Sequence, residues 1–211
     1  MDEYISHFLT SKEKKTIIHQ FQEDSWRQNR QVLWTGIPWD HAQKWAEKHN
    51  MQTLTTAMGP LMAKESGCCP FDRKSKKAWP LYIKGASALF AWHICGGNEV
   101  TVLTPPPPSR FNPSGFTNYQ IIEEPILKGG IGGKHVSIIM LVHPDVKGAE
   151  DFRYQIWPVD KTSSWIAKFG STYSSTRCWR EVKRAPLVHG ANGQNLLYVF
   201  GMKWIRAMLI V

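Results

Sequence analysis

A tryptophan and a group of threonines are the first residues whose types could form a site. Trp34 ends a short apolar run, QVLW, that stops at Thr35-Gly36. Aromatic faces are the usual platform for flat rings such as nicotinamide, adenine or a nucleobase. Thr53, Thr55 and Thr56 open a second apolar run, and hydroxyls at a helix start either cap the helix or contact a ligand. The pattern indicates a ring-binding site near a helix start, with a plain core position as the alternative for Trp34.

The segments around Trp34 have helical spacing. Asp40 is expected to be the N-cap of a helix over HAQKWAEKHN, because Ala42, Trp45 and Ala46 then share one face. Trp34 is therefore expected at the turn that enters this helix. A second helix is expected after Thr53, and Thr55 either caps it or contacts a ligand.

Helices are expected to come first along the chain and strands later. Residues 1–30 are typical of an N-terminal helical segment, and residues 77–97 of a helix that ends at a glycine pair. Strands are expected at 99–103, 119–123 and 135–143, and a last strand or helix at 196–211. These segments predict an α+β fold: a helical N-terminal half followed by a small, largely parallel sheet flanked by helices. A single domain over 1–211 is expected, with 146–211 unassigned.

The bulk composition constrains partners weakly. With 26 Lys and Arg against 17 Asp and Glu, the formal net charge of +9 favours contact with polyanions, nucleotides included. Three charge clusters are interpreted as solvated faces: residues 12–15, 73–77 and 177–184. No basic segment followed by an apolar core opens the chain, so a cytoplasmic protein is expected. The 4 cysteines lack disulfide or zinc spacing, and reduced thiols are expected.

Two further motifs favour structural roles. The glycine loop Lys128–Lys134 superficially resembles a phosphate-binding loop, but no hydroxyl residue follows its lysine and it leads into a strand. It is therefore interpreted as a turn. His135 and His143 flank a buried strand, where histidines usually satisfy structural hydrogen bonds.

Three segments together resemble one enzyme family. They are Val32–Gly36, the run TLTTAMGPLM over 53–62, and Phe116–Tyr119 followed by the sequence EEPIL at 123–127. Over residues 30–145 the chain is similar to the ADP-ribosyl cyclases and the related NAD glycohydrolases. The resemblance implies a cyclase-like fold.

The resemblance also implies site residues. Glu123 would be the catalytic carboxylate, with Trp34 and Trp79 as catalytic walls of the pocket. The substrate-binding residues it implies are Thr53, Thr55, Thr56, Phe116 and Glu124. Phe116 either stacks on a ring or plugs its loop.

The chain departs from the family pattern at two places. Thr55 and Thr56 stand where the family signature has acidic residues. A gapless reading from Phe116–Tyr119 puts Gln120 at the catalytic place, whereas the Glu-x-Pro match favours Glu123. Strand alternation would put Glu123 and Glu124 on opposite faces, with Glu123 preferred.

The implied function is an NAD⁺ nucleosidase that releases nicotinamide and gives ADP-ribose or a cyclic ADP-ribose, as a toxin or effector that depletes NAD⁺ would. A carboxylate near the ribose would stabilise the oxocarbenium character of the sugar. NAD⁺ is the substrate, and no cofactor, metal, membrane or nucleic-acid partner is expected; an immunity or inhibitor protein stays undefined. The alternative is a basic, aromatic-rich nucleic-acid-binding or nuclease-like protein.

Overall fold

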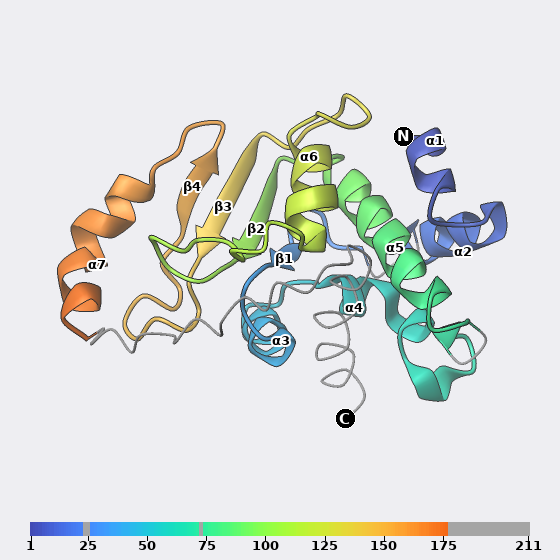
Figure 1. Ribbon diagram of the computed structural model, residues 1–211, viewed down its shortest axis with the longest axis horizontal. Coiled ribbons are helices and arrows are strands. Elements are labelled where there is room, and N and C mark those ends of the chain that lie inside the picture. Colours follow the sequence, from blue (N-terminus) through green and yellow to red (C-terminus); the bar gives the residue numbers. More distant parts are fainter. Residues whose placement is uncertain (23–25, 72–73, 177–211) are drawn as a thin grey trace, which may run out of the picture. The chain divides into compact units, whose positions relative to one another are not determined.

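The computed structural model describes residues 1–22, 26–71 and 74–176 (Figure 1). The chain divides after Ser171, and the site described below lies in the unit Met1–Ser171. The predicted element at 196–211, the charge cluster at 177–184 and Cys178 lie outside the described residues. In the described part, no helix is long and apolar enough to cross a membrane.

Helices precede, connect and follow the strands of a small sheet. The helices are α1 (Asp2–Ser6), α2 (Ser11–Gln22), α3 (Trp39–Lys48), α4 (Leu54–Met58), α5 (Ala78–Ile94), α6 (Glu124–Leu127) and α7 (Thr162–Thr176). Shorter turns are η1 (Gly59–Leu61), η2 (Lys64–Ser66) and the π-helical η4 (Tyr119–Glu123). The strands are β1 (Val32–Trp34), β2 (Glu99–Leu103), β3 (Ile138–Val142) and β4 (Tyr154–Trp157). An α+β fold is therefore confirmed.

The sheet has four strands in the order β1-β2-β3-β4. The first three are parallel, and β4 runs antiparallel to β3. The expected largely parallel sheet is thus present, and the predicted strands at 99–103 and within 135–143 correspond to β2 and β3. Its first strand, however, comes from the N-terminal half of the chain, so helices and strands are not segregated as the sequence suggested.

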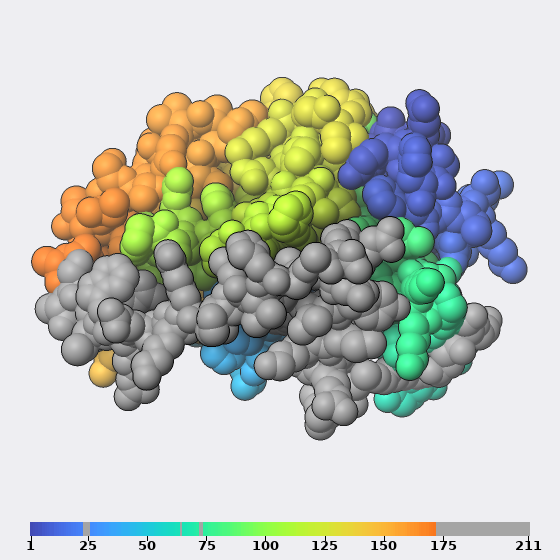
Figure 2. Space-filling model, viewed as in Figure 1, coloured from blue at the N-terminus to red at the C-terminus, as the bar shows by residue number. Residues whose placement is uncertain are grey.

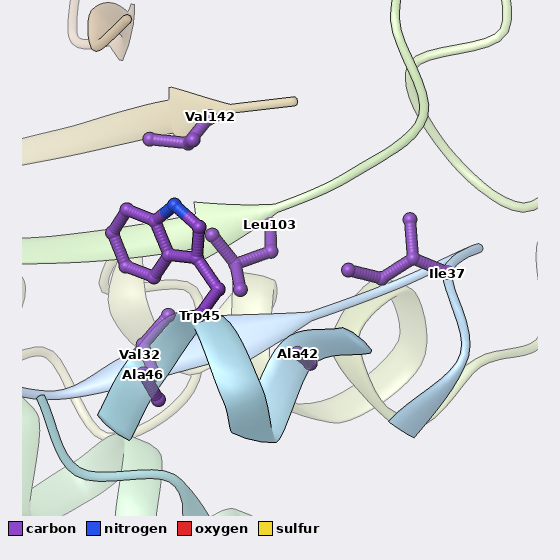
Figure 3. Packing of buried hydrophobic residues seen from close by; sticks show 7 residues of the cluster. All are labelled: Val32, Ile37, Ala42, Trp45, Ala46, Leu103 and Val142. Carbon is purple, nitrogen blue, oxygen red and sulfur yellow. The ribbon is translucent and has the colours of Figure 1, made fainter. Parts of the chain in front are cut away.

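Helix α3 covers one face of the sheet. Ala42, Trp45 and Ala46 pack against Leu103 of β2 and Val142 of β3 (Figure 3), as their helical spacing predicted. The expected N-cap is wrong by two positions: Pro38, with extended backbone, precedes the helix. Proline is compatible with this position because the N–H that it lacks would have no partner within the helix. Asp40 instead lies in the first turn, where a carboxylate complements the helix dipole.

Helix α5 forms the other layer, with α6 and η4 packed beside it (Figure 1). It spans most of the predicted segment 77–97 and ends just before Gly96 and Gly97. Helices α1 and α2 contact its outer side. Gly85 makes this approach close, because a Cβ atom there would lie 2.3 Å from Leu9 Cγ.

The last part of the described chain was not predicted. β4 and α7 lie in the segment that the sequence left unassigned. Trp165 of α7 is 1% exposed and meets the imidazole of His143 edge-on. The C-terminal side of the unit is thereby anchored to the end of β3.

Candidate ligand-binding site at the carboxyl end of the sheet

The three parallel strands end in register at Trp34, Leu103 and Val142. Each is followed by a buried polar residue: Thr35, Thr104 and His143. Backbone hydrogen bonds extend the ladder past the strands, because Thr35 N–H donates to the Leu103 carbonyl at 3.0 Å and Thr104 N–H to the Val142 carbonyl at 3.0 Å. Ligands of open α/β sheets bind outside the carboxyl ends of the strands. This end of the sheet is the candidate site.

A chain of neutral polar groups crosses the site above β1. Thr35 Oγ1 lies 3.0 Å from Thr117 Oγ1, although the two residues are 82 positions apart. Thr117 donates to Gln120 Oε1 at 2.8 Å, and Gln120 Nε2 donates to the Asn112 carbonyl at 3.1 Å. Hydroxyl and amide groups of this kind hydrogen-bond sugar hydroxyls. Gln120, the position favoured by the gapless reading, is therefore connected through Thr117 to Thr35, the residue that follows Trp34.

Gly36 sets the path of the loop that carries this chain. Its φ of +73° suits glycine. A Cβ atom there would lie 2.9 Å from Pro105 Cδ and Cγ and 3.3 Å from Asn112 N. The close approach holds the segment after β2 against the segment after β1, which brings Asn112 to Gln120.

Trp34 is half-buried on the α3 side of the sheet. It packs with Met51 against the core cluster that contains Val32 and Trp45. Alternation along β1 puts Val32 and Trp34 on the same face and Leu33 on the other. Trp34 is thus partly a core residue, and the part of its ring that stays accessible is what a ligand could contact.

The threonines at the start of α4 have separate tasks. Thr53 is the N-cap: its Oγ1 accepts from Thr56 N–H at 3.1 Å and donates to Gln43 Oε1 at 2.8 Å. Thr55 Oγ1 accepts a hydrogen bond from Trp39 Nε1 at 3.4 Å. The prediction that Thr55 caps this helix is wrong, because Thr55 is the second residue of α4. Thr53, which precedes the first residue, has the extended backbone that a cap requires.

Thr53→Ala is expected to destabilise the protein by about 1 kcal/mol, since it removes a buried helix cap. Urea unfolding followed by circular dichroism measures the change. Thr53→Ser keeps the oxygen that accepts from Thr56 N–H, so it should recover most of the loss; an equal loss in both variants would contradict the capping role.

Glu123 and Glu124 differ in environment. Glu123 is 6% exposed, and burial raises the pKa of its carboxyl to about 7, while a hydrogen bond with the Ser87 side chain opposes the shift. Glu124 is half-buried and pairs with Lys128 at 2.5 Å, one turn along the chain. The structure thus directs Glu123 toward α5, whereas Gln120 lies in the polar chain at the strand ends.

The predicted strand at 119–123 is wrong. Residues Tyr119–Glu123 form a π-helical turn that continues into α6, with Pro125 in the first turn of that helix. Pro125 has no N–H to donate into the preceding turn, so the helical hydrogen-bond ladder is interrupted at the point where the π-helical turn gives way to α6. The alternation argument for choosing between Glu123 and Glu124 fails with the strand. The preference for Glu123 as the buried carboxyl still agrees with its burial.

The remaining two predicted site residues, Trp79 and Phe116, have different environments. Trp79 belongs to the start of α5, where its ring stacks on Tyr82 with centroids 5.4 Å apart and meets Phe71 edge-on at 5.0 Å. These contacts place Trp79 with α5 rather than in the polar chain. Phe116 is 80% exposed and directly precedes Thr117. It does not plug its loop, and its ring is free to stack on a ligand.

His143 has the structural role that its place beside a buried strand predicted. The imidazole is fully buried at the end of β3, with Nδ1 bonded to Thr104 and Nε2 lying 2.9 Å from the Tyr154 hydroxyl. Burial lowers the pKa of His143 to about 4. The buried threonines Thr35 and Thr104 were missed as site residues; the signal for them is a polar residue directly after each buried strand.

Acid is expected to destabilise the protein through His143. Because the folded pKa of His143 lies below its ordinary value of 6.5, the stabilisation is present above about pH 6.5 and is lost as the pH falls toward about 4. The loss is on the order of 3 kcal/mol. The raised pKa of Glu123 makes its contribution to stability change with pH in the opposite direction. The wild type and His143→Gln share this contribution, so the measurement is the difference between their unfolding free energies at each pH. A difference that does not change with pH would argue against this role.

The glycine loop is confirmed as a turn. It continues from α6 toward β3, and a Cβ atom on Gly132 would lie 2.6 Å from the ring of Trp92. The Lys134 ammonium lies 5.1 Å from the centre of the same ring. The loop therefore packs on α5 through its glycine and lysine residues.

Comparisons of the chain with protein-family models, with curated proteins and with solved structures found no match.

Proposed function

We propose that the chain is an NAD⁺ nucleosidase with an ADP-ribosyl cyclase-like fold. It cleaves the bond between nicotinamide and ribose and releases nicotinamide with ADP-ribose or a cyclic ADP-ribose. NAD⁺ is the substrate, and its depletion would be the action of a toxin or effector.

One observation supports the proposal most strongly. The hydrogen bond between Thr35 and Thr117 brings together two segments, Val32–Gly36 and Phe116–Tyr119, that each resemble a part of the family's site. Nothing in their separation along the chain required them to meet. They meet at the carboxyl ends of the sheet's parallel strands, which is where open α/β sheets bind ligands.

The residue types suit a nicotinamide nucleoside. Thr35, Thr117 and Gln120 can hydrogen-bond the ribose hydroxyls, and Phe116, which directly precedes Thr117, offers an aromatic face to a flat ring. Trp34 would contact the ligand from the α3 side of the strand end. Aromatic walls also exclude water, which influences whether water or the purine traps the sugar.

The carboxyl that the chemistry needs is assigned to Glu123. It ends the same π-helical turn that contains Gln120. With a pKa of about 7, its carboxylate form increases as the pH rises through neutrality. A buried carboxylate stabilises developing positive charge more strongly than an exposed one, because little water screens it.

The test is to incubate the purified full chain with NAD⁺ and separate the products by chromatography. Nicotinamide is expected together with ADP-ribose or a cyclic product, and the second product distinguishes hydrolysis from cyclisation. A folded preparation that releases no nicotinamide at high protein concentration would sink the proposal.

A further inference from the structure

An arginine in the loop after β2 lies close to the polar chain. Arg110, Phe111 and Asn112 are consecutive residues of this loop. The Asn112 carbonyl accepts the hydrogen bond from Gln120 Nε2, and the Phe111 ring packs on the ring of Tyr119 with centroids 5.8 Å apart. The Arg110 guanidinium carbon in turn lies 5.8 Å from the centre of the Phe111 ring. The loop thus carries a cation near the neutral groups above β1.

The contacts of the guanidinium place it beyond the carboxyl end of β3. Nη1 of Arg110 donates to Asp160 Oδ2 and to Thr162 Oγ1, each at 2.6 Å. The Thr162 side chain also hydrogen-bonds Tyr154, whose hydroxyl lies 2.9 Å from Nε2 of His143, the residue that follows β3. In Figure 2, yellow-green atoms of the loop lie against orange atoms of the segment that contains Asp160 and Thr162. Arg110 is therefore held at the same edge of the sheet as the polar chain.

The guanidinium keeps one edge available for an anion. A guanidinium presents several N–H donors in a planar fork, and both contacts above use Nη1. No group in the described part of the chain accepts a hydrogen bond from Nε or Nη2 of Arg110, and the side chain is 28% exposed. These two nitrogens form an edge that can bind two oxygens of one phosphate. Because Asp160 and Thr162 already hold the fork in place, an anion would bind with little further loss of side-chain freedom.

The separation between the polar chain and Arg110 suits a dinucleotide. Neighbouring strands lie about 4.8 Å apart, so the ends of β1 and β3 are separated by about 10 Å. Dinucleotides bind across the carboxyl ends of the strands of open sheets. With a ribose on Thr35, Thr117 and Gln120 above β1, the phosphates of such a ligand can extend to Arg110 beyond β3.

We propose that Arg110 binds the pyrophosphate of the nucleotide whose nicotinamide ribose lies on the polar chain. This rests on the proposed function and adds a requirement for phosphate in the substrate. NAD⁺ gains binding energy from Arg110, whereas nicotinamide riboside, which has no phosphate, does not. Since Arg110 contacts a part of the substrate that does not react, its loss acts on binding and not on the chemical step.

The test compares the binding of ADP-ribose, which contains the pyrophosphate, to the full chain and to Arg110→Gln by isothermal titration calorimetry. The variant should bind roughly 10- to 100-fold more weakly, because it loses charge-assisted hydrogen bonds to a phosphate. In the cleavage assay, the KM for NAD⁺ should rise by a similar factor while kcat changes little. Cleavage of nicotinamide riboside should be equal in the wild type and the variant.

Asp160→Asn is the matched control, because it breaks the same ion pair and keeps the guanidinium. It should bind ADP-ribose at least nearly as tightly as the wild type. Equal losses of affinity in Arg110→Gln and Asp160→Asn would show that Arg110 has only a structural role, and would overturn the proposal. A folded wild type that does not bind ADP-ribose would overturn it too.

The phosphate contact and the nucleosidase activity can fail separately. Binding of ADP-ribose that depends on Arg110, without nicotinamide release, would support the phosphate contact and contradict the activity. Nicotinamide release from NAD⁺ with the same KM in the wild type and in Arg110→Gln would support the activity and overturn the phosphate contact.

Discussion

Glu123→Gln is expected to lower the rate of nicotinamide release by roughly 10²- to 10³-fold, the size of effect seen when one preorganised electrostatic contact to a transition state is removed. Glutamine is close in shape to glutamate and can keep a hydrogen bond with Ser87. The loss would therefore report the missing negative charge. Single-turnover assays with NAD⁺ measure it.

The pH profile of the wild type gives an independent check. Since the pKa of Glu123 is raised to about 7, the rate should increase as the pH rises through that value, and the increase should vanish in Glu123→Gln. Folding changes in the opposite sense. Because the pKa of Glu123 is raised, the protonated side chain contributes stability at pH values below 4.5, the ordinary pKa of a glutamate. This contribution is lost as the pH rises through about 7. At alkaline pH the glutamine variant should thus be more stable than the wild type, by on the order of 3 kcal/mol. This comparison of stabilities also shows whether Glu123→Gln is folded, so that a loss of activity is not caused by unfolding.

Two neighbouring variants identify the carboxylate. Glu124→Gln should keep the activity, because Glu124 pairs with Lys128 instead of facing the core. Gln120→Glu would put a second carboxylate into the polar chain beside Thr117, and a higher rate would show that the charge acts at the strand ends and not at Glu123. Full activity of Glu123→Gln together with loss in Glu124→Gln would transfer the catalytic role to Glu124.

Trp45→Ala is expected to destabilise the protein by about 3 to 5 kcal/mol, because it leaves a cavity between α3 and the sheet. The indole is 8% exposed and lies against Leu103 and Val142 (Figure 3). Its ring also stacks on His49 with centroids 3.9 Å apart, and its Nε1 donates to the Glu150 carbonyl at 3.0 Å. Urea unfolding at neutral pH measures the change.

Trp45→Phe separates packing from hydrogen bonding. It retains an aromatic ring on the α3 face but loses the bond to Glu150, which is worth about 1 kcal/mol. We expect it to be much less damaging than alanine. Similar losses in the two variants would mean that the hydrogen bond, and not the buried ring, dominates the role of Trp45.

Long periodic segments were predictable from the sequence. Helix α5 and strands β2 and β3 have apolar runs and clear ends, and the spacing of Ala42, Trp45 and Ala46 identified the buried face of α3. The run Tyr119–Glu123 was not predictable, since a short segment with two isoleucines suits a strand as well as a buried helix. Its helical form depends on packing beside α5, which local sequence does not encode.

The site was predictable only in pieces. The sequence identified Trp34, Phe116 and the alternatives Gln120 and Glu123 as separate candidates. The contact between Thr35 and Thr117 depends on the parallel pairing of β1 with β2 and on the path of the loop after β2, which passes Gly36. The burial of Glu123 against Ser87 likewise comes from the packing of η4 on α5.

The π-helical turn has an evolutionary consequence. A π-helical turn holds one more residue than an α-helical turn, and a single residue rotates a helix by about 100°. Deleting one residue from Tyr119–Glu123 would remove the extra residue of this turn and would point its N-terminal residues in another direction relative to α6. A one-codon insertion or deletion could thus exchange which side chain of this segment faces the strand ends. The identity of the group presented there can therefore change between related chains without any substitution at Gln120 or Glu123.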